Sequence, residues 1–138
     1  MSRRSAVLGI SLAMLVAGGL QRAEAQQYVS TTAYRVPFNR IDSLQKLLKA
    51  TKAVDDEAKR RGGIVDNVWL IHTWGGEQNV LNITTWKNWA AMADTALGIG
   101  AASRKVYPDS TQRKRINDGF LWVFEAQPHE DNIYQKVE

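Results

Sequence analysis

One histidine lies within an apolar strand segment, where a proton-handling side chain could act on a bound molecule. The segment Val65–Trp74 is rich in strand-forming residues and contains His72. Because successive side chains of a strand point to opposite faces, His72 shares its face with Val68, Leu70 and Trp74. Imidazole titrates near neutral pH, so His72 could donate a proton or orient a ligand. The alternative is a core or interface histidine that makes a structural hydrogen bond.

A second strand segment, Asn79–Trp86, carries two polar side chains among apolar neighbours. Asn82 and Thr84 are two positions apart and share a face with Trp86. Buried polar groups need hydrogen-bond partners. A bound ligand would supply them, and so would a cross-strand hydrogen bond.

The chain contains five tryptophans, all between positions 69 and 122. Such flat apolar side chains can line a pocket for an aromatic ligand. They can equally fill a hydrophobic core. Trp89 and Trp122 are predicted to be packing residues. The predicted ligand-binding residues are Trp69, His72, Trp74, Asn82, Thr84 and Trp86.

Other chemistry-bearing patterns are weak in this sequence. The chain has no cysteine, which excludes disulfides and cysteine nucleophiles. His129, Glu130 and Asp131 are adjacent, but no second group of metal-binding residues accompanies them, so we expect no metal site. Glycine-rich phosphate loops and the serine-hydrolase elbow are absent from the sequence.

The scaffold for these residues begins with a strand and a long helix. Tyr28–Val36 is rich in Val, Thr and Tyr and precedes Pro37, which predicts a strand. Asn39 is a favourable N-cap, and apolar residues then recur at three- and four-residue steps until Gly62-Gly63. The opposite side carries oppositely charged pairs and is predicted to be solvated: Lys52/Asp56, Asp55/Lys59, Asp56/Arg60 and Glu57/Arg61.

Two more strands and a second helical region follow. Val65–Trp74 and Asn79–Trp86 are separated by a short glycine-containing turn, which predicts an antiparallel hairpin. From Asn88 the pattern is helical, with interruptions, and Asp109 can cap a final short helix. The last predicted elements are a turn at Asn117–Gly119, a fourth strand at Phe120–Ala126 and a polar tail or edge arm at 127–138.

This β-α-β-β-α-β order predicts an α+β protein with a ferredoxin-like fold and a four-stranded antiparallel sheet. Helices cover one face of such a sheet, yet the predicted strands are apolar on both faces. A second copy of the chain is the simplest cover for the other face. We therefore expect a homodimer.

The first 25 residues resemble a cleavable export signal. Arg3 and Arg4 precede an apolar run at 6–20, and Ala23-Glu24-Ala25 fits the small-residue cleavage pattern. We expect a signal peptide at 1–25, a domain at 26–126 and a secreted or periplasmic location. The alternative is an uncleaved N-terminal helix that anchors the protein to the membrane.

The predicted mature chain is nearly balanced in charge. Removing residues 1–25 leaves 15 basic and 13 acidic residues. This small excess gives no general reason to expect nucleic acid or an anionic membrane surface as a partner.

The element order and two local features resemble the dimeric α+β barrel superfamily. These features are the long capped helix that ends at Gly62-Gly63 and the strand-to-helix junction from Leu81 to Trp89. The resemblance covers Tyr28 to about Ala126. Members of the superfamily include NIPSNAP-type domains, small antibiotic-biosynthesis monooxygenases and exported bacterial proteins. It implies a ferredoxin-like fold, a dimer and a cavity, but one architecture hosts many activities.

Haem-binding members of that superfamily use residues that this chain lacks. Haem-degrading relatives use a histidine a little beyond the tryptophan to which Trp86 would correspond. No histidine occurs between Trp86 and His129. We therefore expect no cofactor.

Three hypotheses follow. The first is an exported homodimer that binds a small apolar or aromatic molecule in a barrel cavity. The second is a cofactor-independent monooxygenase in which His72 or Tyr34 handles a proton. The third is a structural or accessory subunit whose cavity is filled by its own tryptophans.

The export hypothesis makes a direct prediction about the natural protein. Cleavage after Ala25 should give a mature chain that begins at Gln26. Intact-mass measurement of protein isolated from its native cells checks this. Recovery of Met1 in a membrane fraction would support the anchored alternative instead.

Overall fold

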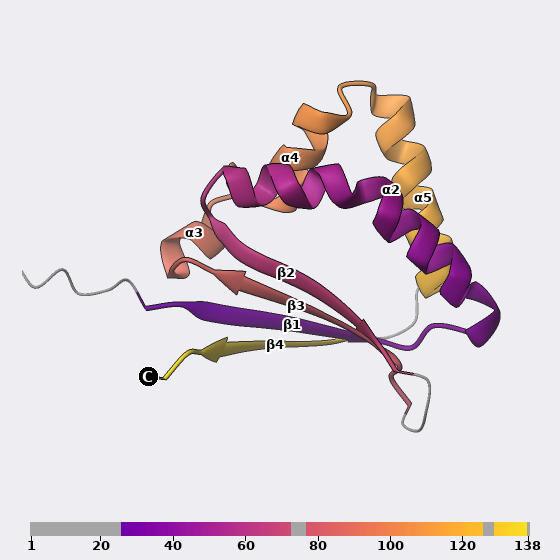
Figure 1. Ribbon diagram of the computed structural model, residues 1–138, viewed down its shortest axis with the longest axis horizontal. Helices are drawn as coiled ribbons and strands as arrows, with labels where there is room; N and C mark the ends of the chain where they lie inside the picture. The colour runs from indigo at the N-terminus through magenta and orange to yellow at the C-terminus, as the bar shows by residue number, and fades with distance from the viewer. Residues whose placement is uncertain (1–25, 73–76, 126–128, 138) are drawn as a thin grey trace, which may run out of the picture.

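The computed structural model describes residues 26–72, 77–125 and 129–137, which form a four-stranded sheet with helices on one face (Figure 1). The strands are β1 (Tyr28–Tyr34), β2 (Ile64–Ile71), β3 (Val80–Trp86) and β4 (Glu130–Gln135). Their order in the sheet is β2-β3-β1-β4, and all neighbours are antiparallel. The α+β class and the ferredoxin-like fold are confirmed.

The long helix α2 (Ile41–Arg60) lies over the sheet, but it starts later than predicted. Asn39 is part of a short 3-10 helix, η1 (Phe38–Arg40), and α2 has no side-chain N-cap. Its end is as predicted, because Gly62 has a φ of 81°, a left-handed conformation that glycine adopts without strain.

Three further helices follow the hairpin: α3 (Trp89–Ala93), α4 (Ile99–Val106) and α5 (Ser110–Phe124). Asn88 caps α3 by accepting a 2.8 Å hydrogen bond from the Ala91 amide, and Asp109 caps α5 in the same way. Within the described residues, no helix is long and apolar enough to cross a membrane.

The prediction of a turn at Asn117–Gly119 and a strand at Phe120–Ala126 is wrong, because α5 continues through Phe124. Ile116, Phe120, Val123 and Phe124 share one side of the helix at helical spacing. Gly119 is a contact residue and not a turn residue. A Cβ atom there would lie 3.0 Å from the Leu47 Cδ2 atom, so the glycine lets α5 approach α2 closely.

The fourth strand lies instead in the segment predicted as a polar tail or edge arm. Glu130–Gln135 pairs with β1, from Tyr28 opposite Gln135 to Ala33 opposite Glu130. This strand is polar because it forms the exposed edge of the sheet.

The two tryptophans predicted to be packing residues are half exposed. Trp89 and Trp122 have exposed fractions of 54% and 53%. The Arg40 guanidinium lies 4.5 Å from the centre of the Trp122 ring and forms a 2.6 Å ion pair with Glu125. These contacts tie the start of α2 to the end of α5.

Most of the buried apolar residues form two separate clusters under α2. The first cluster joins the start of α2 to α5 and the sheet: Val36, Leu44, Val80 and Val123. The second joins the end of α2 to α4 and the start of β2: Val54, Ala58, Ile64 and Ala102. Helix α2 contributes to both, so it holds the two ends of the molecule together.

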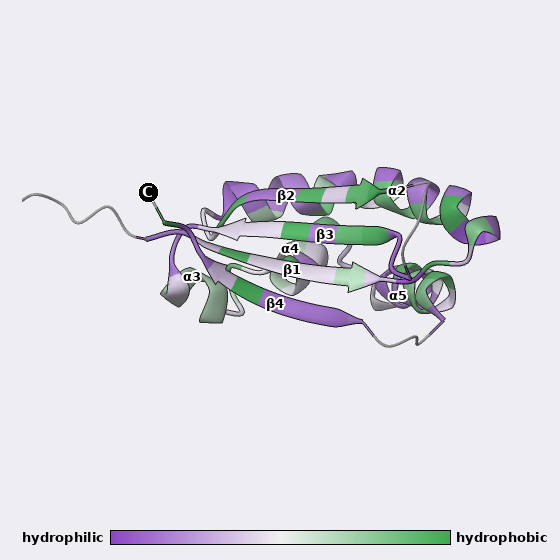
Figure 2. Cartoon of the chain, turned by 90° about the horizontal axis from the view of Figure 1, so that it is seen from below, coloured by the Kyte–Doolittle hydropathy of each residue, from purple (hydrophilic) through white to green (hydrophobic). Residues whose placement is uncertain are grey.

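The face of the sheet opposite the helices is open (Figure 2). Val68 and Leu70 on this face have exposed fractions of 37% and 49%. They pair directly with Ile83 and Leu81 on β3, so four large apolar side chains share the surface. Figure 2 shows this green region on β2 and β3, with polar β4 at the edge.

A buried asparagine connects the start of β3 to the end of β1. The Val36 amide donates to Asn79 Oδ1, and Asn79 Nδ2 donates back to the Val36 carbonyl, each at 2.8 Å. Both residues are almost fully buried. The side chain therefore replaces a missing pair of strand hydrogen bonds.

We predict that Asn79→Ala lowers the free energy of unfolding by about 2–4 kcal/mol, because it leaves two buried backbone groups without partners. Urea denaturation measures the loss. The neighbouring change Gln78→Ala serves as the control and should cost no more than about 0.5 kcal/mol. Equal, small effects of the two changes would contradict the role assigned to Asn79.

Candidate ligand-binding site

A pocket of about 400 Å³ lies between the helices and the sheet, in the gap that separates the two apolar clusters. The middle of α2 forms one wall through Leu48, Thr51 and Asp55, while α4 and α5 enclose other sides. The volume falls within the usual range for small-molecule sites. From the sheet, it is lined by Asn67 and Trp69 on β2 and by Asn82 and Thr84 on β3.

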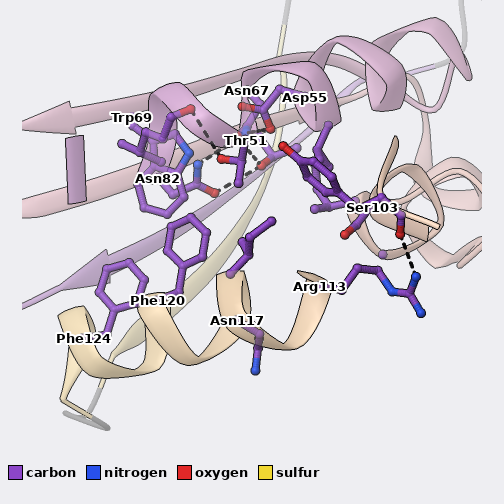
Figure 3. A pocket seen from close by; sticks show the side chains of 17 residues that line it. Thr51, Asp55, Asn67, Trp69, Asn82, Ser103, Arg113, Asn117, Phe120 and Phe124 are labelled. Atoms are coloured by element: carbon purple, nitrogen blue, oxygen red, sulfur yellow. Dashed lines mark hydrogen bonds between the residues drawn. The ribbon is translucent and has the colours of Figure 1, made fainter. Parts of the chain in front are cut away.

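One end of the pocket is aromatic. Trp69, Phe120 and Phe124 line it, and Figure 3 shows them gathered on one side of the view. The Trp69 and Phe124 rings are nearly parallel, with centroids 6.2 Å apart, and Phe120 lies 6.1 Å from Phe124. Tyr34 stacks behind them at 4.2 Å from Phe124. This wall offers flat apolar surface to a flat ligand.

Next to the aromatic wall is a hydrogen-bonded polar network (Figure 3). Asn67 Nδ2 donates to Asp55 Oδ1 at 3.0 Å. Asn67 Oδ1 accepts from Asn82 Nδ2 at 2.7 Å and from Thr84 Oγ1 at 3.1 Å. A central amide thus links one carboxylate on α2 to two side chains on β3, which fixes all four in position.

The Asp55 carboxylate is held in an environment that opposes its charge. Burial raises the pKa of Asp55 above its ordinary value, although the Asn67 hydrogen bond and Lys59 act in the opposite direction. The neighbouring lysines bind elsewhere: Lys59 pairs with Asp66 and Lys52 with Asp56, each at 2.7 Å.

A cationic side chain lines the pocket away from this network. Arg113 donates through Nη1 to the carbonyls of Tyr107 and Pro108, at 2.6 Å each. Figure 3 shows it beside Ser103, extending away from the Asp55–Asn67 contact. The two carbonyls hold the guanidinium against the connection between α4 and α5.

The structure brings three of the predicted ligand-binding residues together in the pocket. Trp69, Asn82 and Thr84 all line it. Asn82 and Thr84 have the cross-strand partner that was one of the two sequence interpretations, and they also face the pocket. Trp86 shares their side of the sheet but packs on the second apolar cluster, and its Nε1 donates to Ser30 Oγ at 2.9 Å.

His72 lies elsewhere. Its side chain is exposed, and Nε2 is 2.7 Å from the Gln78 carbonyl at the far end of the hairpin. It does not face the pocket, because β2 ends at Ile71 and the side chain that follows points to the open side of the sheet. Trp74 lies outside the described residues.

Tyr34 is on the helix side of the sheet but does not line the pocket. Its ring, at the end of β1, stacks on the rings of Trp69 and Phe124 in the aromatic wall. Burial raises the pKa of the Tyr34 phenol, and the nearby Asp131 adds to this effect while a hydrogen bond with Thr32 opposes it. The environment therefore disfavours the phenolate form of Tyr34.

Sequence reasoning missed Asp55 and Asn67. Asp55 was expected to pair with Lys59 on a solvated helix face, but Lys59 binds Asp66 instead. The spacing contained a usable signal: Leu44, Leu48, Thr51 and Asp55 follow one another at steps of three and four. Asp55 therefore belongs to the side of the helix that faces the protein interior.

No family model and no curated protein matches the sequence. Solved structures do match. A NIPSNAP family protein from Agrobacterium tumefaciens aligns over 83% of this chain and 89% of its own, with 14% identity and a TM-score of 0.55.

Two further structures align with a TM-score of 0.52 and 14% identity over 82% of this chain. One is a candidate antibiotic biosynthesis monooxygenase from Nitrosomonas europaea, of which 92% is covered. The other is a dimeric ferredoxin-like protein from an uncultured marine organism, of which 97% is covered. At these identities the likeness is one of fold. The chain has the ferredoxin-like α+β fold that these proteins share.

Proposed function

We propose that this protein is a homodimer in which each chain binds a small aromatic molecule in the pocket beneath α2. The observation that carries this proposal is the pairing of an aromatic wall with a fixed polar network in one 400 Å³ cavity. Small-molecule sites have this composition, since apolar walls supply affinity and a few placed polar groups supply orientation.

The cavity volume favours this function over a purely structural role. An accessory subunit without a ligand would fill its interior with its own side chains. Trp86 and Trp89 pack outside the pocket, and Trp69 forms its wall without filling it.

Ligand binding is also better supported than oxygenation. The two residues considered for proton transfer, His72 and Tyr34, do not line the pocket. The likeness to the Nitrosomonas protein concerns the fold. Binding is therefore the function that the arrangement of side chains supports best.

The open face of the sheet supports the dimer. Val68, Leu70, Leu81 and Ile83 form an apolar surface on it, which favours burial against a second copy. The marine protein of the same fold is described as dimeric. We also propose that the dimer works outside the cytoplasm, on the strength of the signal-like residues 1–25.

Filling the pocket should weaken binding. Ser103 is a half-buried lining residue on α4, so Ser103→Trp should weaken the binding of naphthalene at least about tenfold, measured by calorimetry. Arg104→Trp places the same side chain on the adjacent exposed position and serves as the control. Thermal melts verify that both variants fold.

Gly100→Leu provides a second pocket-filling variant, because a Cβ there meets nothing closer than 3.8 Å. Naphthalene that binds both pocket-filling variants as tightly as the wild type would contradict the proposed site, as would a wild-type protein that does not bind it.

A charge on the open face should separate the dimer. Leu70→Lys puts an ammonium group in the centre of the apolar surface, and we expect a monomer at micromolar concentration in sedimentation equilibrium. The control is Leu121→Lys on α5, where a leucine of similar exposure lies away from the sheet. A wild-type monomer at the same concentration would refute the dimer.

A further inference from the structure

The hydrogen bonds around Asp55 have a fixed direction. An ionised carboxylate can only accept, so Asn67 must turn its amide nitrogen toward Asp55. This leaves Asn67 Oδ1 as an acceptor, and Asn82 must turn its own nitrogen toward it. Thr84 then donates its hydroxyl hydrogen to the same oxygen. The carboxylate on α2 therefore sets the orientation of every polar group in the network.

With this orientation, most N–H and O–H donors of the network are already used, while acceptor positions remain. Asn82 Nδ2 donates to Asn67 and, at 3.4 Å, to the Val68 carbonyl, while the Thr84 hydroxyl has one hydrogen to give. Among these three side chains, one amide hydrogen of Asn67 remains. The Asp55 carboxylate has accepted one bond through Oδ1, although its two oxygens can accept about four.

Asp55 also has no ion pair within the described residues. Lys52 and Lys59, the lysines nearest to it on α2, each bind another carboxylate at 2.7 Å. On the other elements, Asn67 is its neutral partner on β2, and Arg113 on α5 is bound by two carbonyls. A half-buried carboxylate with spare acceptor capacity thus faces the pocket.

We propose that Asp55 is a specificity-determining residue, whose carboxylate accepts a hydrogen bond from a hydroxyl or amino group on the bound aromatic molecule. This inference rests on the proposed ligand-binding function. Asn67 and Trp69 are two residues apart on β2 and share a face, so a ring stacked on Trp69 brings its substituents beside Asn67 and Asp55. A ligand that carries only acceptors would leave the carboxylate without a donor.

Four probes of one ring system test this on the full protein: α-naphthol, α-naphthylamine, α-naphthyl methyl ether and naphthalene. Calorimetry at neutral pH should give at least about tenfold tighter binding of the two donors than of the ether, as expected for a hydrogen bond to a charged group. The ratio between naphthol and naphthylamine tells whether a hydroxyl or an amine is the better donor.

Asp55→Asn should remove the preference, because an amide can present its own N–H group where the carboxylate oxygen stood. Asp56→Asn is the matched control. It removes the same charge one residue away, at an exposed position paired with Lys52, and should keep the preference.

The Asp55→Asn variant should also fold. Because burial raises the pKa of Asp55, the fold disfavours its charged form at every pH above that raised value. The penalty is present at neutral pH and vanishes in acid, so removing the charge should not lower the melting temperature at pH 7.

The outcomes separate this inference from the proposed function. Equal affinity for all four probes in the wild type would overturn the role of Asp55 while the pocket remained a binding site. Loss of the preference in Asp56→Asn would overturn it too, because a general charge effect would then suffice. Failure of every probe to bind, naphthalene included, would contradict both proposals.

Discussion

The packing of α2 across the sheet is the interaction on which the rest of the structure depends. Its 20 residues span about 30 Å, and each half is buried in a different apolar cluster. Helix α5 covers the first half and α4 covers the second. The two helices spread apart from the segment that joins them (Figure 1). The pocket is the space that remains in the middle, so the same helix that stabilises the fold also creates the cavity.

Polar side chains in such a place have an energetic cost. Asp55 lies where burial opposes its charge. Asn67, Asn82 and Thr84 occupy positions where apolar side chains would stabilise the interior more. Among the buried side-chain polar atoms of the described residues, none lacks a hydrogen-bond partner. Each buried polar atom of the network thus has at least one partner, yet an apolar core would be more stabilising, a pattern that agrees with the proposed binding function.

Local sequence signals were sufficient for most of the fold, and three of the six predicted ligand-binding residues line the pocket. Strand composition, the glycines after α2 and the caps at Asn88 and Asp109 act within a few residues, so they can be recognised in the sequence. Gly119 could not be interpreted in this way, because its reason is contact with Leu47 on another helix. The prediction for Asp55 failed for a similar reason. Whether Lys59 pairs with Asp55 or with Asp66 depends on where β2 places Asp66.

The close approach at Gly119 gives the pocket an adjustable width. Phe120, Phe124 and Arg113 all project from α5, so any side chain at position 119 that pushes against Leu47 would move them as a group relative to α2. The obstacle is the tip of a flexible leucine, and small displacements are therefore tolerated. An exchange of residue 119, which does not line the pocket, would therefore change the width of the pocket. The spacing of α2 and α5, which is set outside the cavity, would then change without any change in the residues that line the cavity.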